Sequence, residues 1–139
     1  YSVERIADGM GNIRGFSYDY LMSEVGNDDG FYTCDNTMIN DIRRNSIPVA
    51  ALKTDTTFNV NGKCVVNTYH YNNAIVHSGG HGFLGFEKVV VRNYVNGNLI
   101  QKHVSEYECN TLKSHSMILP FSQKTYQGEK QIINEKVYD

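Results

Sequence analysis

Apolar and polar residues alternate along several stretches of the chain, and glycine-bearing turns separate these stretches. An Asn-Gly pair occurs at Asn61-Gly62 and again at Asn96-Gly97, each time between runs rich in valine, threonine and aromatic residues. Such a pair indicates a β-hairpin, because both central residues of a type I′ turn need a positive φ. We therefore predict one hairpin over residues 56–69 and a second over residues 88–104.

Two looser turns predict further hairpins toward the two ends of the chain. The first turn lies at residues 8–12, and the strand expected after it runs from Ile13 to Tyr20. The second turn lies at Gln127-Gly128, and the strand expected after it runs from Lys130 to Tyr138. The lysines and glutamates of that last strand are typical of a sheet edge, where they discourage unwanted pairing.

The strands that follow the four turns resemble one another, because each leads to a tyrosine. Counted from the turn glycine, the spacing is seven residues to Tyr18 and Tyr69, and ten residues to Tyr107 and Tyr138. A repeated supersecondary unit is typical of a stacked or curled array. We therefore expect one all-β domain over residues 1–139, built of antiparallel hairpin repeats that form a curved sheet or a sandwich-like segment.

Two stretches depart from the hairpin pattern. Within residues 23–47, Asp35 is a candidate helix cap, and Met38 and Ile42 have the spacing of one helix face. We read this stretch as an insertion that contains one or two helical turns. Residues 110–120 show no alternation, and we expect an irregular connection between the third and fourth hairpins there.

A glycine-rich segment in the middle of the chain needs a separate explanation. Glycines surround His81 and are followed by Phe83-Leu84-Gly85-Phe86. Because glycine adopts positive φ without strain, the segment predicts a tight corner between two strands, with Phe83 and Phe86 inserted into a core. The alternative is a ligand-binding loop, but the segment precedes a strand and does not open a helix that could bind phosphate.

The composition suits strands and argues against two classes of protein. Ten tyrosines and six phenylalanines accompany only two prolines, and the formal net charge is −2. With that charge and no run of basic residues, a nucleic-acid-binding surface is not expected. No stretch approaches the roughly 20 apolar residues that cross a bilayer, and the first residues do not resemble a signal peptide. Since the chain starts within a strand pattern, we expect a segment of a longer protein.

Residues that could carry chemistry are scattered along the chain. Cys34, Cys64 and Cys109 are an odd number at long spacings, which fits either one disulfide and one thiol or three thiols. His77 and His81 are four residues apart, but the glycines between them disfavour the helix on which paired zinc ligands lie.

Two further histidines, His70 and His103, fall in the middle of expected strands, where they are either cross-strand neighbours or separate surface residues. Cys64 and His70 could share a strand face, but no acid or oxyanion hole accompanies them. We expect no catalytic site, no metal site and no cofactor. An enzyme is the least favoured hypothesis.

The middle of the chain resembles a motif of RHS/YD-repeat proteins. Tyr69-His70-Tyr71 is followed, after a short gap, by the run His77-Ser78-Gly79-Gly80-His81-Gly82-Phe83-Leu84-Gly85-Phe86. This looks like the Tyr-x-Tyr … His-Arg-x-Gly-Arg-Gly-Phe-Leu-Gly-Phe segment of that family, with Ser78 and His81 in place of its arginines. Residues 8–20 and 128–139 are similar to YD units, whereas residues 23–47 are outside the resemblance.

The resemblance implies a scaffold and not a catalyst. The family includes wall-associated proteins, bacterial RHS proteins and shell subunits of insecticidal toxin complexes, so it implies a secreted or cell-surface protein whose strands spiral around cargo. The implied partners are neighbouring repeats of the same chain, further copies paired through sheet edges, and encapsulated cargo. The residues that would form the structural motif are Gly80, Gly82, Phe83, Leu84, Gly85, Phe86, Tyr18, Tyr69 and Tyr138.

The alternative hypothesis is an extracellular binding module, with carbohydrate as the ligand. Tyrosine rings on an exposed sheet face can stack against sugar rings, although tyrosines in strands more often serve packing. A flat, exposed row would favour this reading. The tyrosines concerned are Tyr69, Tyr71, Tyr94 and Tyr107.

Overall fold

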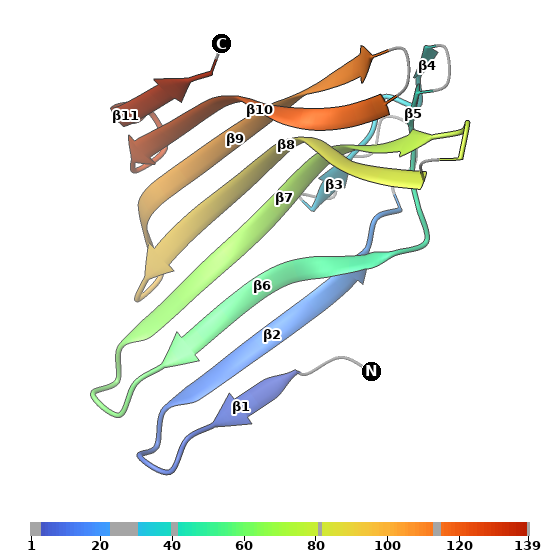
Figure 1. Ribbon diagram of the computed structural model, residues 1–139. Coiled ribbons are helices and arrows are strands. Elements are labelled where there is room, and N and C mark those ends of the chain that lie inside the picture. Colours follow the sequence, from blue (N-terminus) through green and yellow to red (C-terminus); the bar gives the residue numbers. More distant parts are fainter. Residues whose placement is uncertain (1–3, 23–30, 40–41, 81, 113–114, 139) are drawn as a thin grey trace.

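The chain forms one open, curved sheet (Figure 1). The computed structural model describes residues 4–22, 31–39, 42–80, 82–112 and 115–138, and within them every regular element is a strand. The strands are β1 (Arg5–Ala7), β2 (Ile13–Tyr20), β3 (Tyr32–Thr33), β4 (Met38–Ile39), β5 (Ile42–Arg44), β6 (Ala50–Phe58), β7 (Cys64–His77), β8 (Gly82–Val95), β9 (Asn98–Leu112), β10 (His115–Gln127) and β11 (Gln131–Val137). The prediction of an all-β protein is confirmed, with an open sheet and not a sandwich.

The strand order follows the chain closely. Across the sheet the order is β1-β2-β6-β7-β8-β9-β10-β11, and each strand is antiparallel to the next. The short strands β3 and β5 lie off this path and pair with β7, and β4 pairs with β5. All four predicted hairpins are present, because each glycine-bearing turn joins two neighbouring strands of the path.

The turn between β8 and β9 shows why an Asn-Gly pair is such a clear signal. Asn96 has a φ of 49° and Gly97 a φ of 85°, as a type I′ turn requires. The Asn96 side chain accepts a hydrogen bond from the Cys64 main-chain N–H at 2.9 Å. The turn of this hairpin is therefore tied to the start of β7, on the neighbouring hairpin.

The helical turns expected around Met38 are not found in the described residues. Met38 lies in β4 and is exposed, whereas Ile42 lies in β5 and is buried. The strand β5 pairs with the end of β7, from Ile42 opposite His77 to Arg44 opposite Ile75. Main-chain groups at that end of β7 need partners once β6 has diverged, so tertiary pairing overrides the local helical spacing.

The irregular connection expected at residues 110–120 is wrong for the residues that the structure describes. Residues 107–112 of β9 pair with residues 115–120 of β10. The register shifts between Pro120 and Ser122, which places Phe121 in a bulge. Proline lacks a main-chain donor and is tolerated at bulges, so Pro120 signals an interruption within a strand and not its end.

The core is small and lies where β6 and β7 diverge. Leu21, Phe31, Tyr32, Cys34 and Ala74 are buried there, and the partly buried side chains packed around them are Ile47, Ala51, Tyr71 and Phe86. The Tyr32 hydroxyl donates to the Asn45 carbonyl at 2.6 Å and accepts from the Ala74 N–H at 2.9 Å. The insertion is thus packed and hydrogen-bonded against the sheet, and most of the rest of the sheet is a single layer.

Replacing Gly97 by alanine should destabilise the fold by about 1–2 kcal/mol, because a Cβ is strained at a left-handed position. No atom lies within 4 Å of the Cβ site at Gly97, so the loss would come from the backbone alone. Urea unfolding of G97A measures it. The matched control is Gly9→Ala, whose Cβ site is equally open and whose φ is not positive. Equal losses in the two variants would contradict the turn argument.

Candidate functional site

The glycine-rich segment forms the corner between β7 and β8. Gly80 has a φ of 110°, Gly82 of 68° and Gly85 of 137°, so each uses the freedom that glycine has at positive φ. A Cβ at Gly85 would lie 3.3 Å from Cδ1 of Ile118, which makes this the point where β8 approaches β10. The prediction of a corner is confirmed, although His81 lies outside the described residues.

The two phenylalanines of the corner differ in burial. Phe86 packs against the core, and its ring centroid lies 4.7 Å from that of Tyr71. Phe83 is 49% exposed, and its ring contacts the Phe86 ring edge to face at a centroid distance of 5.4 Å. The expectation that both rings enter the core is therefore wrong for Phe83. Phe83 is opposite Val76 and Phe86 is opposite Ala74, so a register shift between them places both rings on the same face of the sheet. Phe83 lies at the start of β8 and is the more exposed of the two. Leu84, also between them, is partly buried.

Tyr71 is the centre of an aromatic group. It contacts Phe31 edge to face at 5.5 Å and stacks with Tyr69 at 6.5 Å. Its hydroxyl donates to the Leu52 carbonyl at 2.9 Å, and burial raises the pKa of Tyr71 to about 12. Burial also raises the pKa of Tyr69. Tyr71 therefore connects β7 to Phe31 of the insertion and to Leu52 of β6.

The tyrosines singled out for stacking do not form one exposed row. All four are partly buried. Tyr94 is opposite Val66, three residues from Tyr69 on β7, so it points to the other face of the sheet. Of the other motif tyrosines, Tyr18 is partly exposed on β2, and the Tyr138 hydroxyl donates to Oε1 of Gln123 at 3.2 Å.

The histidines and cysteines are separated in the sheet. His70 is opposite Val90 and His103 is opposite Val91, which places the two on opposite faces, so they are not cross-strand neighbours. His70 bonds to Thr33 and His103 to Thr125 through their hydroxyls. All three cysteines are free thiols. Among the described residues no group of three His, Cys, Asp or Glu side chains could hold a metal ion.

A polar network centred on Asn73 fixes the insertion to β7 and β8. Asn73 is 2% exposed and has a φ of 50°. Its side-chain nitrogen donates to Glu87 at 2.7 Å and to Asp35 at 2.9 Å, and its oxygen accepts from the Asp35 N–H at 2.9 Å. Arg44 of β5 forms an ion pair with the other Glu87 oxygen. No sequence pattern indicated this network, beyond the tolerance of asparagine for positive φ.

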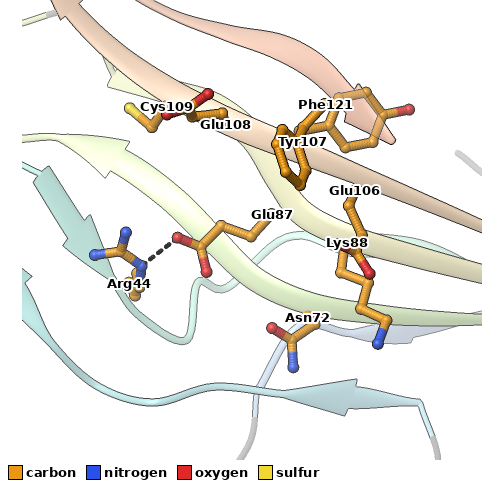
Figure 2. A pocket seen from close by; sticks show the side chains of 9 residues that line it. All are labelled: Arg44, Asn72, Glu87, Lys88, Glu106, Tyr107, Glu108, Cys109 and Phe121. Carbon is orange, nitrogen blue, oxygen red and sulfur yellow. Dashed lines mark hydrogen bonds and ion pairs between the residues drawn. The ribbon is translucent and has the colours of Figure 1, made fainter. Parts of the chain in front are cut away.

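A cleft opens beside this network, where β8 and β9 separate. Figure 2 shows the pair of Arg44 and Glu87 on one side and residues of β9 on the other. The polar part of the cleft has a volume of about 610 Å³ and is lined by Arg44, Asn72, Glu87, Lys88, Glu106, Tyr107, Glu108, Cys109 and Phe121. An apolar hollow of about 310 Å³ adjoins it at Tyr107 and is lined by Leu84, Gly85, Phe86, Val89, Tyr107 and Ile118.

The electrostatics of the cleft suit binding better than nucleophilic attack. Burial raises the pKa of the Cys109 thiol, an effect that Glu87 reinforces and Arg44 opposes. A raised pKa leaves less thiolate, which is the reactive form of cysteine. Glu106 and Glu108 make no ion pair or hydrogen bond with any other described residue. The cleft therefore offers available carboxylates next to an apolar wall.

Comparison of the chain with protein-family models, with curated proteins and with solved structures found no match. The resemblance to YD repeats therefore stays a prediction from the motif. The functional argument depends on the geometry of the sheet, its edges and its cleft. In the described residues no helix is long and apolar enough to cross a membrane.

Replacing Glu87 by alanine should destabilise the protein by about 2 kcal/mol, because it removes the ion-pair partner of Arg44 and one of the two carboxylates to which the buried Asn73 amide donates. Urea unfolding measures the loss. The matched control is Glu108→Ala in the same cleft, which removes a carboxylate without a described partner and should change stability by less than about 0.5 kcal/mol. Similar losses in the two variants would show that the network does not hold the insertion.

The raised pKa of Tyr71 predicts a pH dependence of stability. An unfolded tyrosine ionises near pH 10 and the native Tyr71 near about 12, so between these values the native state holds more protons. Stability should therefore fall as pH rises from 10 to 12. The free energy of unfolding of Tyr71→Phe should be about 1 kcal/mol lower than that of the wild type at neutral pH, and it should fall less steeply between pH 10 and 12. Urea unfolding at several pH values tests this, with the exposed Tyr20→Phe as control; parallel curves for wild type and Tyr71→Phe would refute it.

Proposed function

We propose that this chain is a non-catalytic structural segment of a longer antiparallel sheet, within a secreted or cell-surface protein of the RHS/YD-repeat type. The observation that carries the proposal is the open sheet, whose edge strands β1 and β11 have no partner on their outer sides in the described part of the chain. Every residue of both strands is exposed. An unpaired edge is a template for a further strand.

The directions of the two edges suit continuation by a second unit. The path holds eight strands, and each is antiparallel to the next, so β1 and β11 run in opposite directions. A following unit that placed its β1 beside β11 would extend the same antiparallel order. Neighbouring repeats of the parent chain or further copies of this segment could supply that strand. The motif resemblance supports the same conclusion independently of the edges.

Exposed apolar side chains on the edges support this role. Ile6 on β1 is 54% exposed, and Ile133 on β11 is 48% exposed. Pairing with another strand would cover part of this apolar surface. Lys130 and Lys136 flank the same region of β11 and would limit pairing with unrelated strands.

The carbohydrate-binding alternative has less support. All four of its tyrosines are partly buried. Tyr69 and Tyr71 pack against each other, and Tyr94 lies on the face of the sheet opposite to Tyr69. A row of sugar rings needs exposed rings on one face. The encapsulated cargo that the family resemblance implies remains part of the scaffold proposal.

Self-association through the edges is the measurable consequence. In sedimentation velocity, the mean mass of the wild-type protein should rise with concentration, and Ile6→Lys or Ile133→Lys should weaken this rise by placing a charge on an edge strand. The matched control is Met10→Lys at the tip of the β1–β2 turn, which is 80% exposed and should leave association unchanged. Wild-type protein that stays monomeric throughout, or equal effects of all three variants, would contradict the proposal.

A further inference from the structure

The sheet splits twice at the end away from the Asn-Gly turns, and the first split is filled by the chain itself. β6 and β7 pair from Phe58 opposite Cys64 to Thr54 opposite Thr68, and then separate. Beyond that point, β3 and β5 pair with the free side of β7. The insertion thus supplies two short strands to a main-chain edge that would otherwise have no partner.

The second split has the same geometry, and no described strand fills it. β8 and β9 pair from Val95 opposite Asn98 to Lys88 opposite Glu106. Beyond that point, residues 82–87 of β8 pair only with β7, and residues 107–112 of β9 pair only with β10. Each stretch therefore has one main-chain edge without a ladder partner in the described part of the chain, and the cleft lies between these two edges.

The start of the free stretch of β8 leaves room for another backbone, because no atom lies within 4 Å of a Cβ at Gly82. Further along β8, the Cβ site at Gly85 is already approached by Ile118 of β10 at 3.3 Å, so the open part of the split is at the Gly82 end. Glycine within a strand is typical of a place where another backbone approaches closely. The hollows of about 610 Å³ and 310 Å³ give the volume for several residues of an extended segment.

The charges of the cleft determine which kind of peptide segment would fit it. Its carboxylates are Glu87, Glu106 and Glu108, and its cations are Arg44 and Lys88. Glu87 is neutralised by Arg44. Glu106 and Glu108 make no ion pair with another described residue, and Lys88, which is opposite Glu106 on β8, offsets only one of these two charges. On the other side, Leu84, Phe86 and Ile118 form an apolar wall. A segment with basic side chains alternating with apolar ones would satisfy both sides, because successive side chains of a strand point to opposite faces.

We propose that the cleft between β8 and β9 is a docking site for an extended peptide segment of a partner protein, with alternating basic and apolar residues, which binds by adding a strand to the free edge of β8 or β9. Main-chain hydrogen bonds supply affinity in such strand addition, and alternate side chains supply specificity. The proposal does not depend on the array function, because the cleft lies within the sheet and not at β1 or β11.

A fluorescein-labelled hexapeptide that alternates lysine and valine tests the proposal on the whole chain. Fluorescence anisotropy should show saturable binding, and the same peptide with methylated main-chain nitrogens should not bind, since its main chain cannot donate hydrogen bonds. Hydrogen exchange should show new protection in residues 82–87 or 107–112. Protection confined to β1 or β11, absence of binding at roughly 1 mM peptide, or equal binding of the methylated peptide would overturn it.

Charge variants test the selectivity of the same site. The double variant Glu106→Gln with Glu108→Gln should weaken binding of the lysine–valine peptide roughly fivefold, as expected for two partly exposed ion pairs. The matched control is Glu135→Gln on the edge strand β11, which should leave binding unchanged. An alternating glutamate–valine peptide should bind more weakly than the lysine–valine peptide. Equal binding of the two peptides, or a loss in Glu135→Gln as large as in the double variant, would reject the site.

Discussion

Main-chain pairing is the constraint on which this structure depends. Most of the sheet is one layer, so burial of side chains is concentrated in the small core under the insertion. Elsewhere each strand makes main-chain hydrogen bonds with its neighbours in the sheet, two for the inner strands and one for β1 and β11. Main-chain donors and acceptors need partners wherever water is excluded, and an antiparallel ladder supplies them along the whole strand. The tight glycine turns keep consecutive strands adjacent and in register.

The same constraint explains why the insertion exists as short strands. After β6 leaves β7, the side of β7 from Tyr71 onward needs partners, and β3 and β5 provide them. The Tyr32 hydroxyl and the Asn73 amide then satisfy groups that the ladders do not reach. Two kinds of interaction therefore hold the insertion: apolar packing around Phe31 and Tyr71, and a polar network that ends at the pair of Arg44 and Glu87.

Where a strand has no neighbour to pair with its main chain, the structure offers places for binding. The outer sides of β1 and β11 have no partner in the described residues, and the cleft between β8 and β9 presents two further free edges. The edges suit more strands of the same kind, because their directions continue the antiparallel order. The cleft suits a different occupant, since Glu106 and Glu108 stand beside an apolar wall. A scaffold segment with an internal docking slot is consistent with both features.

The sequence by itself determined the hairpins, because Asn-Gly and related turns encode positive φ locally, and the alternating runs of valine, threonine and tyrosine encode strands. It therefore predicted the all-β fold, the edge strand at the C-terminal side and the glycine corner. It did not reveal the strands of the insertion, the exposure of Phe83, or the network of Asn73 and Glu87. Of the residues that line the cleft and its apolar hollow, it singled out Tyr107, Cys109 and the corner residues Leu84, Gly85 and Phe86, each for a different reason. Only the tertiary structure decided these features, because they depend on where neighbouring strands diverge and which distant main-chain groups are left to be paired.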